Sequence, residues 1–335
     1  MTTVEIRPKG AYFAKSCPQR VQLDVLRPCE PLPDSPFLQK LVRAGEEYEG
    51  ETLGEFLDGV DGVVSIDADD PDAREWHTLN AIAEGALIIA GGRLPVDVEA
   101  HRVGEPDLLV RCGDGYAPID VKSHKSLDAA RKAGAGTALV GDIAEPFIER
   151  AAVDAEMVAR RHVGDLLQLA HYRRLLEAAG LAPTGCNVAG IYGSEGVVVW
   201  YDLDALLVDT PEHVVPAPVG PLSPMARYDL EFAQRSAVVA AAEAHRLNES
   251  VALLAEPIVC ASCDMCRWRE WCGEQLEEAA DLSLISGIGV GRRRLYKAEG
   301  VENLHDLAAL DWRAAELARR DVDLVDLSVK ACALA

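Results

Sequence analysis

The sequence predicts an α/β fold in which helices flank a mixed β-sheet. Three observations lead to this class. Residues 36–58 have helical spacing, residues 86–123 form short apolar segments separated by Gly and Pro, and residues 153–180 return to a long helical pattern that ends at Gly180. Groups of strands set between helices are typical of proteins in which helices cover the faces of a sheet.

The remaining elements follow in order along the chain. A helix over 70–86 starts beside Pro71, whose fixed φ suits the first turn of a helix. Residues 127–150 are rich in Ala and Gly and favour neither helix nor strand. We expect further strands, a hairpin and another helix over 86–92, 94–103, 106–112, 116–123, 186–203 and 224–248. Residues 281–335 are mostly helical, so we expect two domains, 1–280 and 281–335.

The composition is that of a soluble globular protein with a strongly acidic balance. The 335 residues carry 33 Lys and Arg against 55 Asp and Glu, a net charge of −22, and 49% of them are hydrophobic. These values exclude a disulfide-stabilised miniprotein and a disordered tail. The chain has no apolar stretch long enough for a signal peptide or a membrane span, so we expect a cytoplasmic protein without a membrane partner. The acidic balance also argues against a protein that coats DNA without specificity.

The strongest chemical signal lies in the segment GEPDLLVRCGDGYAPIDVKSHK. Asp107 starts one expected strand, and Asp120 and Lys122 lie two apart on the next, so the side chains of the latter two share a face. A hairpin between the strands brings Asp107 beside Asp120. Two adjacent carboxylates repel one another unless a divalent cation neutralises them, and a nearby lysine offsets charge on a phosphate. The set indicates metal-assisted hydrolysis of a phosphodiester, although an Asp-X-Lys strand taken alone is more often a solvated face with a weak ion pair.

Two further pairs support the catalytic interpretation. Gln168 and Tyr172, in QLAHY, lie four apart on one face of the long helix, and Gly45 and Glu49 lie on the helix that precedes the strands. In this order the elements resemble the RecB-like branch of the PD-(D/E)XK nuclease superfamily, which has a helix-borne Gly-x-x-x-His or Glu, a strand Asp, a (D/E)-x-K strand and a Q-x-x-x-Y helix. The resemblance implies a restriction-endonuclease-like core with a mixed sheet flanked by helices.

The resemblance also implies a role for each matched residue. Asp107, Asp120 and the backbone carbonyl of Ile119 are expected to bind Mg²⁺ or Mn²⁺. Glu49 takes the position at which the family often has His, and its carboxylate is a competent ligand for these hard cations. Lys122 is the expected catalytic lysine. The full set of expected catalytic residues is Asp107, Asp120, Lys122, Gln168 and Tyr172.

Four cysteines crowd into CASCDMCRWREWC, residues 260–272, with the spacing C-x2-C-x2-C-x5-C. In a reducing compartment such a group predicts a metal site, because thiolates bind Zn²⁺ or an iron–sulfur cluster. Four cysteines this close would be cramped around one zinc, and a zinc ribbon usually has two C-x2-C pairs a dozen or more residues apart. Zinc and free thiols remain the alternatives.

A second resemblance concerns these cysteines. The AddB-like and CRISPR-associated exonuclease-like members of the RecB-like superfamily resemble this chain in having one Cys near the N-terminus and a C-x2-C-x5-C group after the nuclease core. In them these residues hold a 4Fe–4S cluster that closes the nuclease domain like a clasp. The resemblance implies that the ligands here are Cys17, Cys263, Cys266 and Cys272. Cys260 is then surplus, or it competes with Cys17.

The segment LSLISGIGVGRRRLYKAEGVENLHDLAAL carries three alternate glycines between two helical segments. Gly287, Gly289 and Gly291 leave backbone N–H groups accessible, and a helix N-terminus after such a turn favours a phosphate. Arg292 and Arg293 follow at once. The pattern resembles a helix-hairpin-helix motif, which implies that these five residues bind the DNA backbone without reading its sequence. A structural turn and a docking module for a protein partner are the alternatives.

Together these features predict a metal-dependent DNA nuclease in which a metal-bound water attacks the phosphodiester in line. The resemblance to RecB-like nucleases implies single-stranded or end-exposed DNA as the substrate, DNA repair or recombination as the setting, and a helicase or another repair protein as a partner. The alternative is a noncatalytic DNA-binding scaffold that supports a helicase, which the acidic charge favours. A zinc-stabilised RNA-processing enzyme is a third hypothesis.

Overall fold

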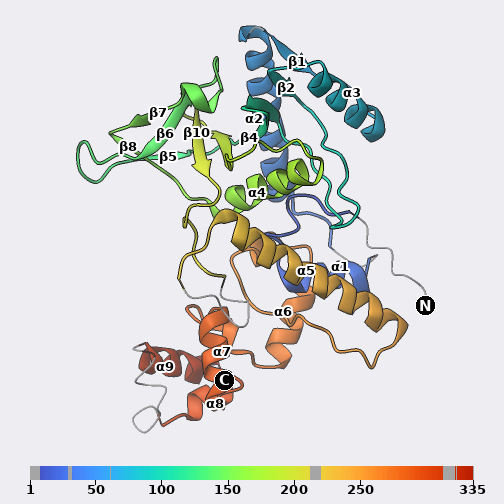
Figure 1. Cartoon of the computed structure of the whole chain (residues 1–335). Coiled ribbons are helices and arrows are strands. Elements are labelled where there is room, and N and C mark those ends of the chain that lie inside the picture. Colours follow the sequence, from blue (N-terminus) through green and yellow to red (C-terminus); the bar gives the residue numbers. More distant parts are fainter. Residues whose placement is uncertain are drawn as a thin grey trace. The chain divides into compact units, whose positions relative to one another are not determined.

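The computed structural model describes residues 8–28, 32–60, 62–211, 220–311, 321 and 323–334 (Figure 1). The chain forms two compact units. Unit 1 consists of Met1–Ser16, Gln39–Thr210 and Val219–Ala233, and unit 2 of Cys17–Leu38, Pro211–Pro218 and Gln234–Ala335. These bounds differ from 1–280 and 281–335, because unit 2 draws on chain segments both before and after the strands.

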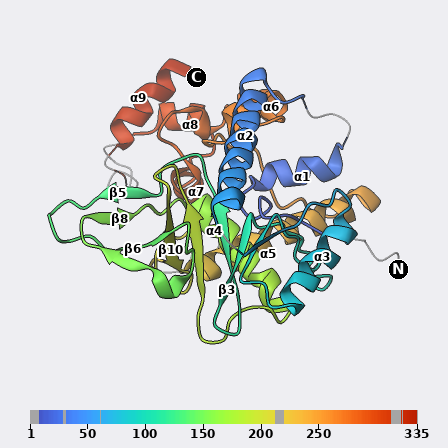
Figure 2. The ribbon, with the colours of Figure 1, turned by 90° about the horizontal axis from the view of Figure 1, so that it is seen from above.

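A mixed sheet of eight strands, counted over the described residues, forms the centre of unit 1. In spatial order its strands are β1 (Val63–Ser65), β2 (Ile88–Ala90), β3 (Leu108–Cys112), β4 (Gly115–Val121), β9 (Val188–Tyr192), β10 (Val197–Asp202), β6 (Ala138–Asp142) and β7 (Ala152–Asp154). β1 is parallel to β2 and β4 is parallel to β9, and the other neighbours are antiparallel. β5 (Leu127–Ala129) and β8 (Met157–Ala159) form a separate small sheet beside β6 (Figure 2).

Helices cover both faces of this sheet. α4 (Val163–Ala178) packs across β4 and β9 on one face (Figure 1), and α3 (Pro71–Ala83) joins the same apolar layer. On the other face α2 (Pro36–Gly59) contributes Phe56 to a cluster that includes Ile119 and Trp200, near the short helix η1 (Ile148–Arg150). Because successive strand residues point to opposite faces, Ile119 faces α2 and Asp120 faces α4. The α/β class with a mixed sheet between helices is confirmed.

Two of the predicted elements are wrong. The helical pattern over 153–180 becomes a helix only from Val163, because residues 157–159 pair with β5 and residues 152–154 pair with β6. Strand pairing here overrides the local helical pattern. The segment 94–103 forms no strand of the sheet, since Asp97 and Arg102 close a turn through backbone bonds and an ion pair.

The regular elements of unit 2, in its described residues, are all helices, and they include the start of α2. Its other helices are α1 (Pro18–Leu26), α6 (Arg269–Glu278), α7 (Val290–Ala298), α8 (Leu304–Ala309) and α9 (Leu324–Leu334), the short η2 (Cys263–Met265) and η3 (Leu282–Leu284), and the second part of α5 (Pro224–Leu247). α7, α8 and α9 lie together (Figure 1) and share a core around Tyr296, Leu307 and Leu327. In the part of the chain that the structure describes, no helix has both the length and the apolar character needed to cross a membrane.

Candidate active site

The β3–β4 hairpin holds two carboxylates side by side. Leu108 lies opposite Ile119 in the antiparallel register, so Asp107 stands opposite Asp120, just before β3 begins. One oxygen of Asp107, Oδ2, accepts the backbone N–H of Val121 at 2.6 Å. The structure therefore brings together the two acidic residues that the strand pattern singles out, and it orients one of them through the backbone of the other's strand.

Asp120 is almost completely buried, and its charge is paired. Its side chain is 1% exposed and forms an ion pair with Lys122. Burial raises the pKa of Asp120, although Lys122 opposes the shift. Burial also raises the pKa of Asp107, and repulsion from Asp120 and Glu49 adds to the effect. Both carboxylates would therefore be stabilised by further positive charge, which a hard divalent cation supplies.

Lys122 remains a cation in this setting. Burial alone would lower its pKa, but the Asp120 carboxylate outweighs burial and holds the pKa above its usual range. The lysine follows β4 directly and its side chain is 17% exposed, so it stands between the buried carboxylate and solvent. A charged, partly accessible lysine is suited to contact a phosphate.

α4 presents an amide and a phenol to the same carboxylate. The Gln168 amide donates from Nε2 to Asp120 Oδ1 at 3.1 Å, and the same nitrogen lies 3.0 Å from the hydroxyl of Tyr172. Gln168 and Tyr172 meet because they are four apart on one helix. Burial raises the pKa of Tyr172, so its side chain is a neutral phenol. Gln168 thus fixes the orientation of the Asp120 carboxylate.

Glu49 and Ile119, the other two predicted metal ligands, lie around this pair. Glu49 is on α2, and its carboxylate is within electrostatic range of Asp107. Ile119 is fully buried in β4, between Leu108 of β3 and Gly190 of β9. Over the described residues, no three His, Cys, Asp or Glu side chains stand ready as a preformed metal-ligand group. The ion pair described above already engages one of the two carboxylates.

The structure adds two charged residues, Lys15 and Asp165, that the sequence patterns do not predict for this site. Lys15, in the N-terminal turn of unit 1, donates from Nζ to Gln168 Oε1 at 3.0 Å. Burial lowers the pKa of Lys15 to about 8, and the nearby Lys122 adds to the shift. Asp165 lies one turn before Gln168 on α4, 3.2 Å from Nε2 of His124. Its helical spacing from Gln168 is a usable signal, whereas the contact of Lys15 spans 153 residues and leaves no local pattern.

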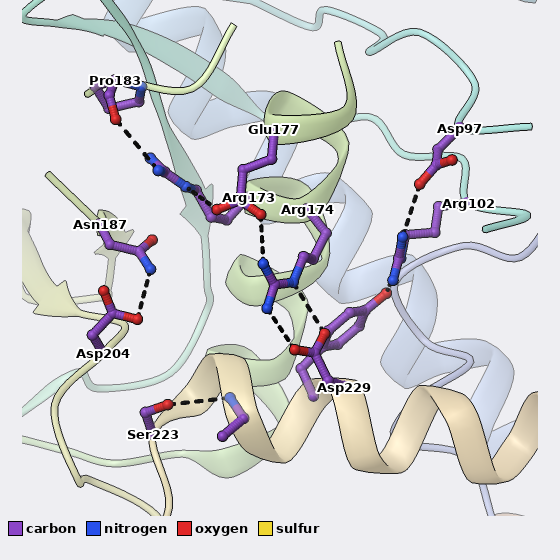
Figure 3. Close-up of polar contacts among 12 residues, drawn as sticks. Asp97, Arg102, Arg173, Arg174, Glu177, Pro183, Asn187, Asp204, Ser223 and Asp229 are labelled. Atoms are coloured by element: carbon purple, nitrogen blue, oxygen red, sulfur yellow. Dashed lines mark hydrogen bonds and ion pairs between the residues drawn. The ribbon is translucent and has the colours of Figure 1, made fainter. Parts of the chain in front are cut away.

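The far half of α4 is anchored by a network of arginines (Figure 3). Arg174 donates to Asp229 on α5 at 3.0 Å and pairs with Glu177. Arg173 also pairs with Glu177, and it donates to the backbone carbonyl of Pro183. These bonds fix the rotation of α4 about its axis, and with it the face that carries the amide and the phenol.

The carboxylates, the lysines and the amide thus form one polar cluster at the end of β4. Comparisons with protein-family models, curated proteins and solved structures find no match. Two carboxylates that retain repulsion suit Mg²⁺ or Mn²⁺, and two lysines beside them suit an anionic substrate.

Unit 2 contains both Cys17 and the four cysteines of residues 260–272, which come from two distant parts of the chain. Cys17 precedes α1, and the others lie at or before the start of α6 or within it. The sulfur atoms of Cys260 and Cys263 are 3.6 Å apart, and the thiol of Cys17 is hydrogen-bonded to Cys260. The structure therefore joins the N-terminal cysteine to the later group. It also brings in Cys260, to which the family pattern assigns no place.

Hydrogen bonds link three of these thiols and change their pKa values. Bonds from Cys17 and then from Cys263 lower the pKa of Cys260. The same contacts raise the pKa of Cys17 and of Cys263, and burial adds to both shifts. Burial raises the pKa of Cys272 to about 11, with contributions from Cys266 and Cys260. Thiolates are the donors that iron–sulfur clusters and zinc ions use, but over the described residues these sulfur atoms do not form a preformed metal-ligand group.

The glycine turn before α7 is formed, but its arginines already have acidic partners. Gly287 has φ 103°, a conformation that glycine adopts without strain. Arg292 forms an ion pair with Asp321 at 3.0 Å, and Arg293 forms one with Asp281 at 2.7 Å. These carboxylates neutralise the two arginine charges that would otherwise attract DNA phosphates. Binding of the DNA backbone stays a prediction for Gly287, Gly289, Gly291, Arg292 and Arg293.

Proposed function

We propose that the protein is a metal-dependent DNA nuclease of the RecB-like type, with a restriction-endonuclease-like core. The observation that carries the proposal is the convergence of Asp107 and Asp120, from a hairpin, with Gln168 from a helix. Asp120 is 1% exposed and Gln168 5% exposed, so this is no solvated surface pair. Burying carboxylates costs stability, and perturbed pKa values concentrate at functional sites, so catalysis explains the cluster better than folding does.

The metal-binding part of the proposal assigns the carboxylates of Asp107, Asp120 and Glu49 and the carbonyl oxygen of Ile119 as ligands. Their burial and mutual repulsion support this assignment, since the pKa values of the two aspartates are raised. A divalent cation held there would supply the positive charge that makes a water acidic enough to attack a phosphodiester at neutral pH. Oxygen donors of this kind suit Mg²⁺ and Mn²⁺.

The other residues act on the phosphate and on the carboxylates. Lys122, held as a cation by Asp120, offsets the negative charge that develops on the phosphate oxygens as the ester bond breaks. Gln168 keeps one oxygen of Asp120 in place, and the neutral hydroxyl of Tyr172 supports the amide. The proposed substrate is single-stranded or end-exposed DNA, and the proposed setting is DNA repair with a partner helicase.

The proposal is tested by cleavage of end-labelled single-stranded DNA by the full chain, purified without oxygen, in Mg²⁺ or Mn²⁺ and in a chelator. We expect cleavage only with the cation. Lys122→Gln removes the charge that stabilises the transition state, so the rate should fall by about 10²–10³-fold. The matched control is Lys125→Gln, which alters an exposed lysine three residues further on and should leave the rate unchanged.

Two results would contradict this function. The first is that the folded protein binds DNA in every condition and never cleaves it, which would favour the noncatalytic scaffold. The second is that Lys122→Gln cleaves as fast as Lys125→Gln, which would remove Lys122 from the reaction.

We further propose that unit 2 holds a structural 4Fe–4S cluster. The ligands that the family pattern predicts are Cys17, Cys263, Cys266 and Cys272. The hydrogen bond between Cys17 and Cys260 and the 3.6 Å separation of the Cys260 and Cys263 sulfur atoms support Cys260 as an equal candidate. The role assigned to the cluster is structural, because joining distant segments removes entropy from the unfolded chain.

A further inference from the structure

The N-terminal turn of unit 1 is anchored by small and aromatic residues. Ala11 and Ala14 are buried, and Phe13 packs edge-on against Phe232 with ring centroids 5.2 Å apart. Tyr12 lies between these anchors in sequence, yet it is 67% exposed. The turn is therefore well fixed, while one large aromatic ring on it is left open to solvent.

This exposed ring belongs to the neighbourhood of the proposed catalytic site. The hydroxyl of Tyr12 is within electrostatic range of both Lys122 and Tyr172. The hydroxyl of Ser16 donates to the carbonyl oxygen of Tyr12 at 2.9 Å, which closes the backbone of the turn that carries the ring. A fixed aromatic surface beside a phosphate-binding site is the usual means by which proteins hold an unpaired base.

Lys15 covers one face of the Tyr12 ring. Its Nζ lies 3.9 Å from the ring centroid, 3.0 Å from Gln168 Oε1 and 3.4 Å from the carbonyl oxygen of Gly164. These close contacts are all with neutral groups; Asp165 and Asp120 also attract the ammonium group, although neither forms an ion pair with it in the described residues. An ammonium group has three N–H donors, so a phosphate oxygen would take the place of one of these neutral partners, and the 67% exposure of Tyr12 leaves ring surface accessible to a base.

We propose that Tyr12 and Lys15 bind the nucleotide next to the scissile phosphate, with its base on the exposed ring of Tyr12 and its phosphate on Lys15. The inference rests on the proposed nuclease function and specifies its substrate. A base can stack on Tyr12 only when it is unpaired, because a base inside a duplex has both faces covered by its neighbours. The site therefore selects single-stranded segments and accepts many sequences, since every base has an aromatic face.

The first test measures equilibrium binding of a fluorescein-labelled single-stranded oligonucleotide in Ca²⁺. Loss of one stacked base weakens binding by about 5- to 150-fold, so we expect this for Tyr12→Leu. Tyr12→Phe keeps the ring and should bind like the wild type. The matched control is Trp76→Leu, which removes an aromatic residue that is 61% exposed on α3 and should have no effect. A closed duplex without ends should bind equally well to the wild type and to Tyr12→Leu.

The second test separates the phosphate contact from the stacking contact. Lys15→Gln should reduce the slope of log affinity against log salt concentration by about 0.7, the value for one phosphate contact on a single strand. Tyr12→Leu should leave that slope unchanged. An oligonucleotide with 2-aminopurine at the bound position should lose fluorescence on the wild type and keep it on Tyr12→Leu.

The two tests also distinguish this inference from the function on which it rests. If the wild type cleaves single-stranded DNA and Tyr12→Leu binds it with unchanged affinity, the inference is wrong and the nuclease function stands. If the wild type neither binds nor cleaves single-stranded DNA, both are wrong.

Discussion

His171 lies between the two matched residues of α4, but its contacts are structural. It is fully buried, with Nδ1 2.8 Å from the Tyr228 hydroxyl and Nε2 2.9 Å from the carbonyl oxygen of Val103. A carbonyl oxygen only accepts, so Nε2 carries the proton and Nδ1 accepts from Tyr228. Burial lowers the pKa of His171 to about 4, so the ring is neutral near pH 7. These two hydrogen bonds connect α4 to Tyr228 on α5 and to the backbone at Val103.

This histidine makes stability depend on pH. Its folded pKa of about 4 lies below the unfolded value of about 6.5, so on acidification the unfolded chain binds the proton first. The contribution is complete above pH 6.5 and is lost as the pH falls towards 4, by about 2 kcal/mol between pH 7.5 and pH 5. His171→Gln stays neutral and should lack this component. Denaturant unfolding of both proteins at the two pH values measures it, and equal pH dependence would refute it.

Sequence patterns find residues that share an element and miss those that only the fold brings together. Asp120 and Lys122 could be paired because strand side chains alternate, and Gln168 and Tyr172 because a helix repeats every three to four residues. Lys15 has no such relation to Gln168, from which it is 153 residues distant. Its place in the site depends on how the N-terminal turn packs, which no local spacing encodes.

At the scale of single elements, α2 is longer than its composition favours. The helix has 24 residues and contains Gly45, Gly50 and Gly54 in its interior. A Cβ at Gly54 would meet no atom within 4 Å. Because Gly in a helix interior is about 0.5–1 kcal/mol less favourable than Ala, Gly54→Ala should increase the free energy of unfolding by that amount and leave cleavage unchanged. A lower melting temperature for this variant would contradict the expectation.

At Gly115, in the β3–β4 hairpin, there is in contrast no space for a side chain. A Cβ at Gly115 would lie 2.4 Å from the backbone nitrogen of Pro183 and 2.5 Å from the carbonyl carbon of Ala182. Backbone atoms cannot move aside as a side chain does, so Gly115→Ala should destabilise the protein by about 1–3 kcal/mol. Cleavage should fall as well, because β4 carries Asp120. Thermal unfolding and cleavage rates check both effects, and a variant equal to Gly54→Ala in both would show that the hairpin tolerates the shift.

The sheet was predictable where strands are continuous and apolar, and unpredictable where they are short. β3 and β4 follow from their apolar runs and the turn between them. Three residues, as in β8, are too few for a period of two to be distinguished from a helical repeat. The run Met157–Ala159 becomes a strand because β5 pairs with it, and that partner lies about 30 residues earlier in the chain.

At the scale of the whole molecule, the contact between α1 and α6 joins a segment that precedes the strands in the sequence to a segment that follows them. Trp268 is 2% exposed, and its indole N–H donates to Asp24 at 2.7 Å. If the cysteine group holds a cluster, Cys17→Ser should reduce the iron and sulfide bound per chain and lower the melting temperature of the anaerobically purified protein. Cys332→Ser, which changes an exposed thiol on α9, should alter neither.

Cys260→Ser decides between the two candidate ligand sets. Full iron content in this variant would identify Cys260 as surplus, as the family pattern implies, and loss of iron would identify it as a ligand. A colourless wild type with bound zinc would contradict the cluster itself.

The segments of unit 2 that contact one another are synthesised at widely separated times. The backbone N–H of Ala255 donates to Gln22 Oε1, and these residues are 233 positions apart. At about 5–20 residues per second, roughly 10–50 s of translation separate their synthesis. β10 ends at Asp202, so every strand of the large sheet has been made before Ala255 and Trp268, which bond to α1, are synthesised. The nascent chain can complete its sheet while Cys17 is still unpaired, and a metal site that includes Cys17 can form only after residues 260–272 have been made.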